Sequence, residues 1–357
     1  MSVHGGEVWQ VASELGISAS DVLDFSANIN PRGLPLRARE RLAQCASDPN
    51  LLRLYPDPSA RVLRAALSET LGVAFESILI GPGSEALLYP ILHAHRPTKA
   101  LIPVPAFAEY RRVCEQLKVE VIPYQLERSR CFRPSVLDLC GAIAAERAPF
   151  VFLNNPHNPS GSLLSADEAR RIADAGAAVV VDEAFIDYTP DASLTADASR
   201  RPGLIVLRSL TKFYGCPALR VGYLVAHPDE VRRIAAFLPV WPVTQFALDT
   251  CVEALADAEH ASLSRSENTK RREALAIALQ SLGLNVFPSA ANYLLVELGA
   301  DMPRASELRA LMLRAHHILI RNCDSFEGLT PGRYIRLAIR DEADNGRLVE
   351  ALSEVLG

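Results

Sequence analysis

Short apolar segments recur through the middle of the chain, and amphipathic segments separate most of them. The apolar residues of the short segments are continuous and do not alternate with polar ones, a pattern typical of strands that are covered on both faces. The pattern predicts seven strands, at residues 77–80, 100–104, 119–123, 150–153, 177–181, 204–207 and 221–225.

The intervening segments have the apolar spacing of helices, and one of them opens with Ser165-Ala166-Asp167-Glu168. In this capping box, Ser165 and Glu168 can reciprocally satisfy free amides at the start of a helix. Alternating strands and helices predict an α/β fold with a mostly parallel, seven-stranded sheet that has helices on both faces. The predicted helices span residues 84–95, 107–117, 135–146 and 165–175.

The pattern changes after about residue 240, where a long amphipathic stretch, residues 245–282, predicts one or two connecting helices. A smaller α+β domain is expected after it, with strands at residues 293–298, 318–321 and 334–339 and a helix at residues 306–316. Three parts of the chain are therefore expected. They are an N-terminal segment with part of the small domain, a large domain, and a connecting helix with the C-terminal small domain, at residues 1–45, 46–245 and 246–357.

The composition narrows the class of protein. Of the 357 residues, 49% are hydrophobic and 22% are charged, which is ordinary for a globular protein. No apolar run approaches the roughly 18 residues of a membrane-spanning helix. The net charge is −5, from 37 Lys and Arg against 42 Asp and Glu, so the chain has no overall attraction to nucleic acid. Neither a membrane nor a nucleic acid is an expected partner.

The cysteines are seven in number, scattered, and without a Cys-x-x-Cys pair, so neither a disulfide framework nor a zinc cluster is predicted. The neighbouring histidines of the chain lack carboxylates arranged as metal ligands, and no metal site is expected. The first residues, Met-Ser-Val-His-Gly-Gly-Glu, lack the basic and then apolar layout of a secretory signal. A reducing cytoplasm is therefore the expected location.

Unusual polar residues follow several predicted strands, which is where ligands bind in a parallel sheet. The glycine turn at residues 81–85 leads into a helix and would direct free amides at an anion. An Asn- and Pro-rich segment, residues 154–161, follows a later strand, and Asp182, Lys212 and Arg220 come after it. Taken singly, these features are also explained by a turn, a helix cap or a solvated lysine.

Taken together and in this order, the residues resemble those of the fold-type I pyridoxal phosphate enzymes, in particular the aspartate aminotransferase superfamily. The likeness covers nearly the whole chain. It rests on a Gly-Ser turn, an aromatic residue after a strand, Asn-Pro-x-Gly, Asp at a strand end, and Ser-x-x-Lys with an arginine eight residues on. It implies the fold-type I pyridoxal phosphate (PLP)-dependent transferase fold and pyridoxal 5'-phosphate as the cofactor.

The resemblance implies a role for each residue at the cofactor ring. Lys212 would hold the cofactor covalently, and Asp182 would pair with the protonated ring nitrogen, so these two are the expected catalytic residues. Asn158 would donate a hydrogen bond to the O3' oxygen, and Phe107 would stack on the ring face.

The resemblance also implies a binding site for the cofactor phosphate, formed by the backbone of Gly83, Ser84 and Glu85, the Ser209 hydroxyl and Arg220. In this superfamily a tyrosine of the neighbouring subunit also reaches the phosphate, and Tyr55 in Leu54-Tyr55-Pro56 matches it. A homodimer in which Tyr55 completes the site across the interface is therefore expected.

Two arginines of the C-terminal region match substrate-binding positions. Arg336 matches the arginine that clamps the α-carboxylate of an amino acid. Arg321 matches the arginine that histidinol-phosphate aminotransferases use for the substrate phosphate. Two arginines with separate roles predict a phosphorylated amino acid as the substrate.

Two related enzyme families share this layout, the L-threonine O-3-phosphate decarboxylases of cobalamin synthesis and the histidinol-phosphate aminotransferases. The segment that begins with His4, the segment around Asn28, and Phe185 at a position where transaminases usually have tyrosine are similar to the decarboxylases. Decarboxylation is therefore the expected activity, and transamination of histidinol phosphate with 2-oxoglutarate is the alternative. His4 and Asn28 are expected to fold over the site and share in binding the substrate.

Two other classes of protein are disfavoured. A nucleotide-dependent dehydrogenase would need a Gly-x-Gly-x-x-Gly turn between a strand and a helix, which the chain lacks. A catalytically silent protein of the same fold would have no reason to keep Lys212, Asp182 and Arg220 together.

Overall fold

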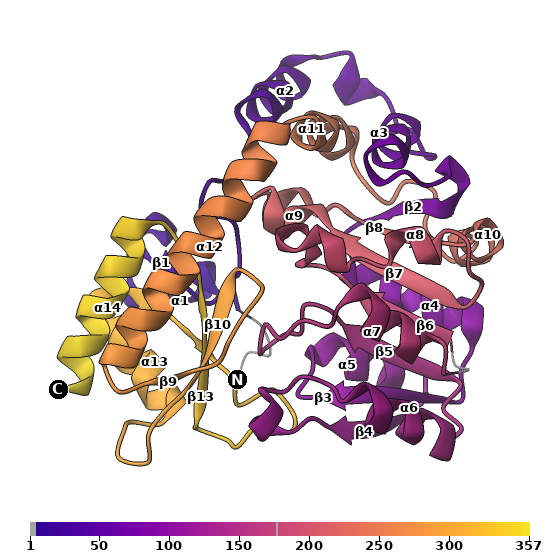
Figure 1. Ribbon diagram of the computed structural model, residues 1–357. Coiled ribbons are helices and arrows are strands. Elements are labelled where there is room, and N and C mark those ends of the chain that lie inside the picture. Colours follow the sequence, from indigo (N-terminus) through magenta and orange to yellow (C-terminus); the bar gives the residue numbers. More distant parts are fainter. Residues whose placement is uncertain (1–4, 176–177) are drawn as a thin grey trace.

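A sheet of seven strands lies at the centre of the larger lobe (Figure 1). The computed structural model describes residues 5–175 and 178–357. The strand order is β2-β8-β7-β6-β5-β3-β4, in which β8 is antiparallel to both neighbours and the other neighbouring pairs are parallel. The predicted mostly parallel sheet is therefore confirmed. Its strands are β2 (Ile78–Gly81), β3 (Lys99–Val104), β4 (Glu120–Gln125), β5 (Phe150–Asn154), β6 (Ala178–Asp182), β7 (Leu204–Ser209) and β8 (Gly222–Ala226).

Helices cover both faces of this sheet because successive side chains of its central strands point to opposite faces and are apolar on both. Phe152 and Val180 pack on one face, whereas Val151 and Val181 pack on the other. The helices of the first face are α4 (Leu88–His95), α5 (Ala108–Gln116) and α10 (Pro228–Ala235). Those of the second face are α6 (Val136–Ala145), α7 (Ala166–Ala173) and α8 (Thr195–Ala198).

The start of α7 confirms the predicted capping box. The Ser165 N–H donates to Glu168 Oε2 at 2.8 Å, and the Glu168 N–H donates to Ser165 Oγ at 3.3 Å.

A further layer covers β2 and β8, where α3 and α11 share an apolar core with the two strands. The helices of this layer are α2 (Leu36–Ser47), α3 (Arg61–Leu71) and α11 (Gln245–Leu255), and they lie at the top of Figure 1.

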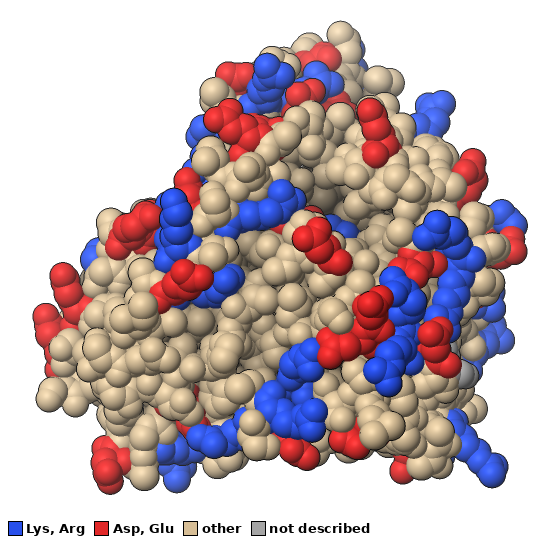
Figure 2. All heavy atoms as spheres, viewed as in Figure 1, with Lys and Arg blue, Asp and Glu red and all other residues tan. Residues whose placement is uncertain are grey.

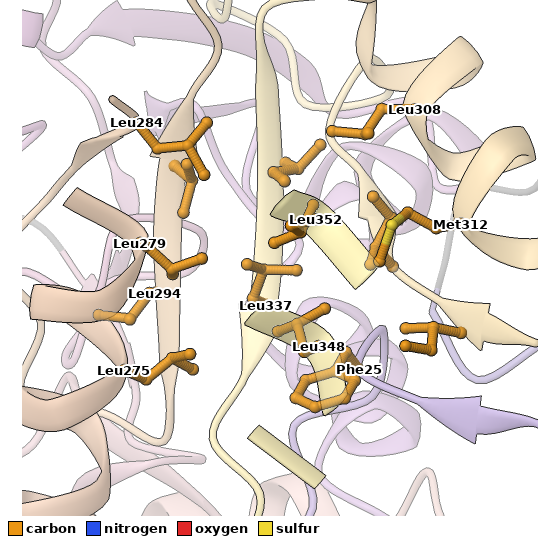
Figure 3. Packing of buried hydrophobic residues seen from close by; sticks show 14 of the residues in the cluster. Phe25, Leu275, Leu279, Leu284, Leu294, Leu308, Met312, Leu337, Leu348 and Leu352 are labelled. Carbon is orange, nitrogen blue, oxygen red and sulfur yellow. The ribbon is translucent and has the colours of Figure 1, made fainter. Parts of the chain in front are cut away.

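The smaller lobe contains a large apolar core to which strands and helices both contribute (Figure 3). Its larger sheet is antiparallel with the order β12-β13-β10-β9, and β1 and β11 form a separate parallel pair. The strands are β1 (Leu23–Asp24), β9 (Asn285–Val286), β10 (Tyr293–Glu297), β11 (Ile318–Leu319), β12 (Arg321–Asn322) and β13 (Tyr334–Ala338). The helices are α1 (Val8–Leu15), α12 (Ala258–Ser281), α13 (Ala305–His316) and α14 (Glu342–Leu356), and α12 runs between the lobes (Figure 1).

The predicted strand at residues 318–321 is wrong as a single element. The structure divides it, because β11 pairs with β1 whereas β12 pairs with β13. Ile318 and Ile320 pack in the core while Leu319 packs against α1. The apolar run is therefore buried on two sides, but two different strands supply its hydrogen bonds. The predicted connecting stretch forms two helices, α11 and α12, and the domain boundaries remain a prediction.

No helix within residues 5–175 and 178–357 is long and apolar enough to cross a membrane. On the face that Figure 2 shows, Lys and Arg side chains are interspersed with Asp and Glu side chains.

Candidate active site

A cavity of about 330 Å³ lies where the large lobe faces the small lobe and the N-terminal segment. The last residues of β5, β6 and β7 line it, because the carboxyl ends of parallel strands meet at one edge of the sheet. Most of the residues predicted from the sequence are brought together here: Asn28, Gly83, Ser84, Glu85, Phe107, Asn158, Asp182, Ser209, Lys212, Arg220, Arg321 and Arg336.

Asp182 is the last residue of β6, and it presents a nearly buried carboxylate to the cavity. Its Oδ2 accepts a hydrogen bond from the Tyr110 hydroxyl at 2.5 Å, and its Oδ1 accepts one from the Ala184 N–H at 3.0 Å. Burial raises the pKa of Asp182, and the two hydrogen bonds and Lys212 oppose this rise. Because both donors are uncharged, the carboxylate can still accept a cationic partner such as a protonated ring nitrogen.

Lys212 lies in α9 (Leu210–Phe213), a short helix that directly follows β7. The N-terminal segment holds this turn, because Asn30 donates from its N–H to the Lys212 carbonyl at 3.0 Å and from Nδ2 to the Phe213 carbonyl at 2.7 Å. Burial, with help from Arg220 and Arg336, lowers the pKa of Lys212 to about 8. A larger fraction of the amine is therefore neutral and nucleophilic near neutral pH.

The glycine turn after β2 leaves a hollow lined by backbone, and a residue with a side chain in place of Gly83 or Gly222 would fill it. Gly83 has φ +94°, and a Cβ at this residue would come within 2.9 Å of an Arg220 guanidinium nitrogen. A Cβ on Gly222 would lie 2.3 Å from the Ser84 nitrogen. The Gly83 N–H already donates to the Gly81 carbonyl at 2.8 Å, so the next two amides are the ones suited to an anion. Ser209 and Arg220 line the same cavity, as expected for a phosphate site.

The residues predicted for the ring face and for O3' also lie in the cavity. Phe107 packs against the Tyr110 ring in a T-shaped arrangement, with centroids 5.6 Å apart and an interplanar angle of 82°. Asn158 is buried, and its N–H donates to Asn154 Oδ1 at 2.7 Å, while its own Oδ1 accepts from Arg336 at 2.6 Å. The Asn158 amide nitrogen is therefore the part of this side chain that can donate to a cofactor oxygen.

Arg321 and Arg336 stand directly opposite one another on β12 and β13, and both line the cavity. Like charges in such a cross-strand pair are unfavourable. Burial and Arg336 lower the pKa of Arg321 to about 10. Arg336 also donates to the Ser26 carbonyl at 2.9 Å, and Arg321 donates to Ser325 Oγ at 2.7 Å. Anionic groups in the cavity would relieve the repulsion between the two guanidinium groups.

Asn28 is buried and lines the cavity, and within the described part of the chain its Oδ1 has no hydrogen-bond partner. An unused acceptor at this position can receive a donor from a ligand. His4, the other predicted substrate contact of the N-terminal segment, lies outside the described residues.

Tyr55 does not line the cavity of its own chain. Its side chain is 76% exposed, and it stacks on Trp241 with ring centroids 4.3 Å apart. The predicted role of Tyr55 requires a second subunit, and it remains a prediction.

Several residues of the site were not predicted from the sequence. Ser26 and Ser325 contact the two arginines, and Asn154 joins β5 to β6 through an Nδ2 hydrogen bond to the Asp182 carbonyl at 2.8 Å. In the sequence, Tyr110 has the spacing of an ordinary core residue of an amphipathic helix, so it was not predicted to contact the site. The available signal was its place three residues after Phe107, which puts both aromatic rings on one face of the helix.

Comparison with known proteins identifies the family. The family model of the class I and II aminotransferases matches residues 20–352. The chain belongs to the class I and II aminotransferase family. The cofactor of this aminotransferase-family protein is pyridoxal 5'-phosphate. The cavity fits that group, since it offers an amine, an acid, an aromatic face and a cradle for a phosphate.

Three relatives of this family member are informative. It is 34% identical to the threonine-phosphate decarboxylase of Salmonella typhimurium, over 99% of this chain and 97% of that protein. It is 30% identical to the adenosylcobalamin biosynthesis bifunctional protein CobDQ of Leptospira interrogans, over 99% of this chain, which spans only 41% of that longer protein. The crystal structure of the histidinol-phosphate aminotransferase from Clostridium acetobutylicum superposes with a TM-score of 0.85 at 28% identity, over 94% of this chain and 99% of that one.

Proposed function

We propose that this protein is a PLP-dependent carboxy-lyase that converts L-threonine O-3-phosphate to (R)-1-aminopropan-2-ol O-2-phosphate and carbon dioxide, for the aminopropanol arm of cobalamin. The observation that carries the proposal is the pair of opposed arginines, Arg321 and Arg336, in the same cavity as Lys212. This arrangement suits a substrate with a carboxylate and a second anion. The likeness to the Salmonella protein that is named threonine-phosphate decarboxylase supports the choice of substrate.

Four residues of the cavity have a task at the cofactor ring in this proposal. When bound, the cofactor supplies a ring that accepts the electron pair released by the broken Cα bond. Asp182 keeps the ring nitrogen protonated, and Asn158 and Phe107 orient the ring. Lys212 holds the cofactor covalently until the substrate arrives, and its amine is then the group suited to return a proton to Cα.

The orientation in which the protein holds the substrate would decide which Cα bond breaks, because the bound cofactor would weaken only a suitably aligned bond. Arg336 is expected in decarboxylases and aminotransferases alike, so it does not select the reaction. We assign the selection to the phosphate contact of Arg321 and to the N-terminal residues His4 and Asn28, which would share in holding the substrate phosphate and carboxylate and so orient the carboxylate for loss. Phe185 lines the cavity, and the tyrosine hydroxyl that transaminases usually place there is absent from this residue.

The alternative function is that of a histidinol-phosphate aminotransferase. The same arginines would then bind the substrate phosphate and the carboxylate of 2-oxoglutarate. The likeness to the Clostridium aminotransferase structure, with its TM-score of 0.85, favours this candidate.

One assay separates the two functions. The purified holoenzyme is incubated with L-threonine O-3-phosphate, and in a parallel reaction with histidinol phosphate and 2-oxoglutarate. Carbon dioxide and aminopropanol phosphate in the first reaction, without glutamate in the second, support the decarboxylase. Glutamate formation without carbon dioxide overturns it. The Lys212→Ala variant is the control, because it should be inactive in both reactions.

We further propose that the protein acts as a homodimer. Exposed apolar side chains lie beside Tyr55 in sequence or in space, among them Leu54 and Trp241, and a second copy would cover them. If Tyr55 reaches the cofactor phosphate of the other subunit, inactive Tyr55→Ala and Lys212→Ala variants should regain activity when they are unfolded and refolded together. A mixed dimer then contains one intact site. Mixtures that stay inactive although mixed dimers form would contradict the role of Tyr55.

A further inference from the structure

The hydroxyl of Tyr110, a residue of a helix that covers one face of the large sheet, donates a hydrogen bond to the carboxylate of Asp182. Tyr110 belongs to α5 and is buried, and among the described residues it is not one that lines the cavity. Its hydroxyl donates to Asp182 Oδ2 at 2.5 Å, while the Ala184 N–H holds the other carboxylate oxygen at 3.0 Å. Because each carboxylate oxygen of Asp182 accepts from a different donor, the two hydrogen bonds hold the carboxylate in one orientation.

Packing holds the Tyr110 ring in place. The ring stacks on Phe152 of β5 with centroids 5.0 Å apart and an interplanar angle of 7°. The edge-on contact with Phe107 connects the same ring to the residue expected on the cofactor face. One side chain that does not face the ligand therefore contacts both the acid and the aromatic residue that are expected to hold the cofactor ring.

The hydrogen bond favours the ionised form of Asp182. Burial and the nearby Asp182 charge raise the pKa of Tyr110 well above its ordinary value, so Tyr110 acts only as a donor. A donor to a carboxylate stabilises its charged form and opposes the rise in pKa that burial causes. Among the described residues, the titratable groups that face Asp182 are Tyr110 from α5, Lys212 from α9 and Tyr293 from β10.

We propose that Tyr110 is a positioning residue that keeps the Asp182 carboxylate ionised and turned toward the cofactor ring. Tyr110 thereby sets how strongly the bound cofactor withdraws electrons. The inference rests on the role of Asp182 given under the proposed function, but it does not depend on which substrate is used.

The Tyr110→Phe variant keeps the packed ring and removes the hydroxyl. Without this donor the pKa of Asp182 should rise, so the acidic limb of the kcat–pH profile should move to higher pH by about one unit. The alkaline limb should stay in place. The absorbance of the cofactor-loaded protein, titrated without substrate, should show the same shift. On the acidic limb kcat should therefore fall by up to about tenfold at a given pH, with KM little changed because the substrate contacts are intact.

Tyr334→Phe is the matched control. The Tyr334 hydroxyl also donates to a carboxylate, Glu297 Oε1, at 2.9 Å, but this pair lies in the small lobe and outside the cavity. Its loss should leave the pH profile and the absorbance titration unchanged. A Tyr110→Phe protein that folds, binds the cofactor and titrates like the parent would overturn the proposal.

A second variant keeps the proposal testable if Tyr110→Phe does not fold. Incorporation of 3-fluorotyrosine at position 110 retains the hydroxyl and makes it a stronger donor, so the acidic limb should move to lower pH. No movement, or movement to higher pH, would count against the proposal. The Asp182→Asn variant distinguishes failure of the Tyr110 proposal from failure of the role proposed for Asp182. An unchanged cofactor spectrum in that variant would show that Asp182 does not pair with the cofactor ring.

Discussion

The cofactor wall and the substrate wall of the cavity are built from different kinds of structure. We use "cofactor wall" for Asp182, Ser209 and Lys212, and "substrate wall" for Arg321 and Arg336. Asp182 and Ser209 end β6 and β7, which are central strands hydrogen-bonded to neighbours on both sides. Arg321 belongs to β12, a strand of two residues at the edge of its sheet.

The charges of the two walls differ as well. On the cofactor wall, Asp182 already has two hydrogen-bond donors in the protein. On the substrate wall, two guanidinium groups oppose one another across neighbouring strands. The cofactor wall is thus preorganised by the fold, whereas anions that enter the cavity would relieve the repulsion between the two guanidinium groups of the substrate wall. Variants of the cofactor wall should change the chemical step, and variants of the substrate wall should change recognition.

The largest effect is expected on the cofactor wall from Lys212→Ala. Loss of the amine removes both the covalent attachment and the proton donor, so kcat should fall by about 10²- to 10⁴-fold or more. Steady-state kinetics measure the loss, and borohydride reduction followed by peptide mass spectrometry locates the attached cofactor. Attachment to any other side chain of the unaltered protein would contradict the assignment.

A smaller and more selective effect is expected on the substrate wall. Each charge-assisted hydrogen bond contributes about 1.5 to 3 kcal/mol, so Arg321→Gln and Arg336→Gln should each lower kcat/KM by about 10- to 100-fold. Arg321→Gln should also abolish the preference for phosphorylated over unphosphorylated threonine, whereas Arg336→Gln should retain it. Equal loss of the preference in both variants would mean that the two arginines do not have separate roles.

The pKa of Lys212 tests whether the walls are coupled. In the cofactor-free protein the reaction of this amine with an acylating reagent should be half-maximal at about pH 8 instead of 10.5, because burial, Arg220 and Arg336 disfavour its charged form. Arg336→Gln removes one positive charge and should move the midpoint upward by a fraction of a unit. The midpoint is measured by mass spectrometry of the labelled peptide, and a downward movement would contradict the coupling.

The smallest effect is expected far from both walls. Ser165→Ala removes the side-chain cap of α7 and should lower the free energy of unfolding by about 1 kcal/mol. Thermal or denaturant unfolding measures this loss. The kinetic constants should stay at parental values, and a change in kcat would show that the large-lobe helices are not independent of the site.

Much of the large lobe could be predicted because its signals are local. Continuous apolar runs predict buried strands, and each predicted strand of the large sheet lies within a few residues of an observed one. The capping box at Ser165 depends on residues three apart and is confirmed. The small lobe was harder, since β11 and β12 lie in one apolar run and differ only in the distant strand that pairs with each.

The sequence by itself determined the residue types that the chemistry needs and the order of strands and helices along the chain. Only the tertiary structure decided that Arg321 faces Arg336, that Asn30 holds the turn of Lys212, and that Tyr110 supports Asp182. The members of each pair lie in different elements and, apart from the two arginines, are many tens of residues apart. Their contact depends on how these elements pack, which hydrophobic periodicity does not encode.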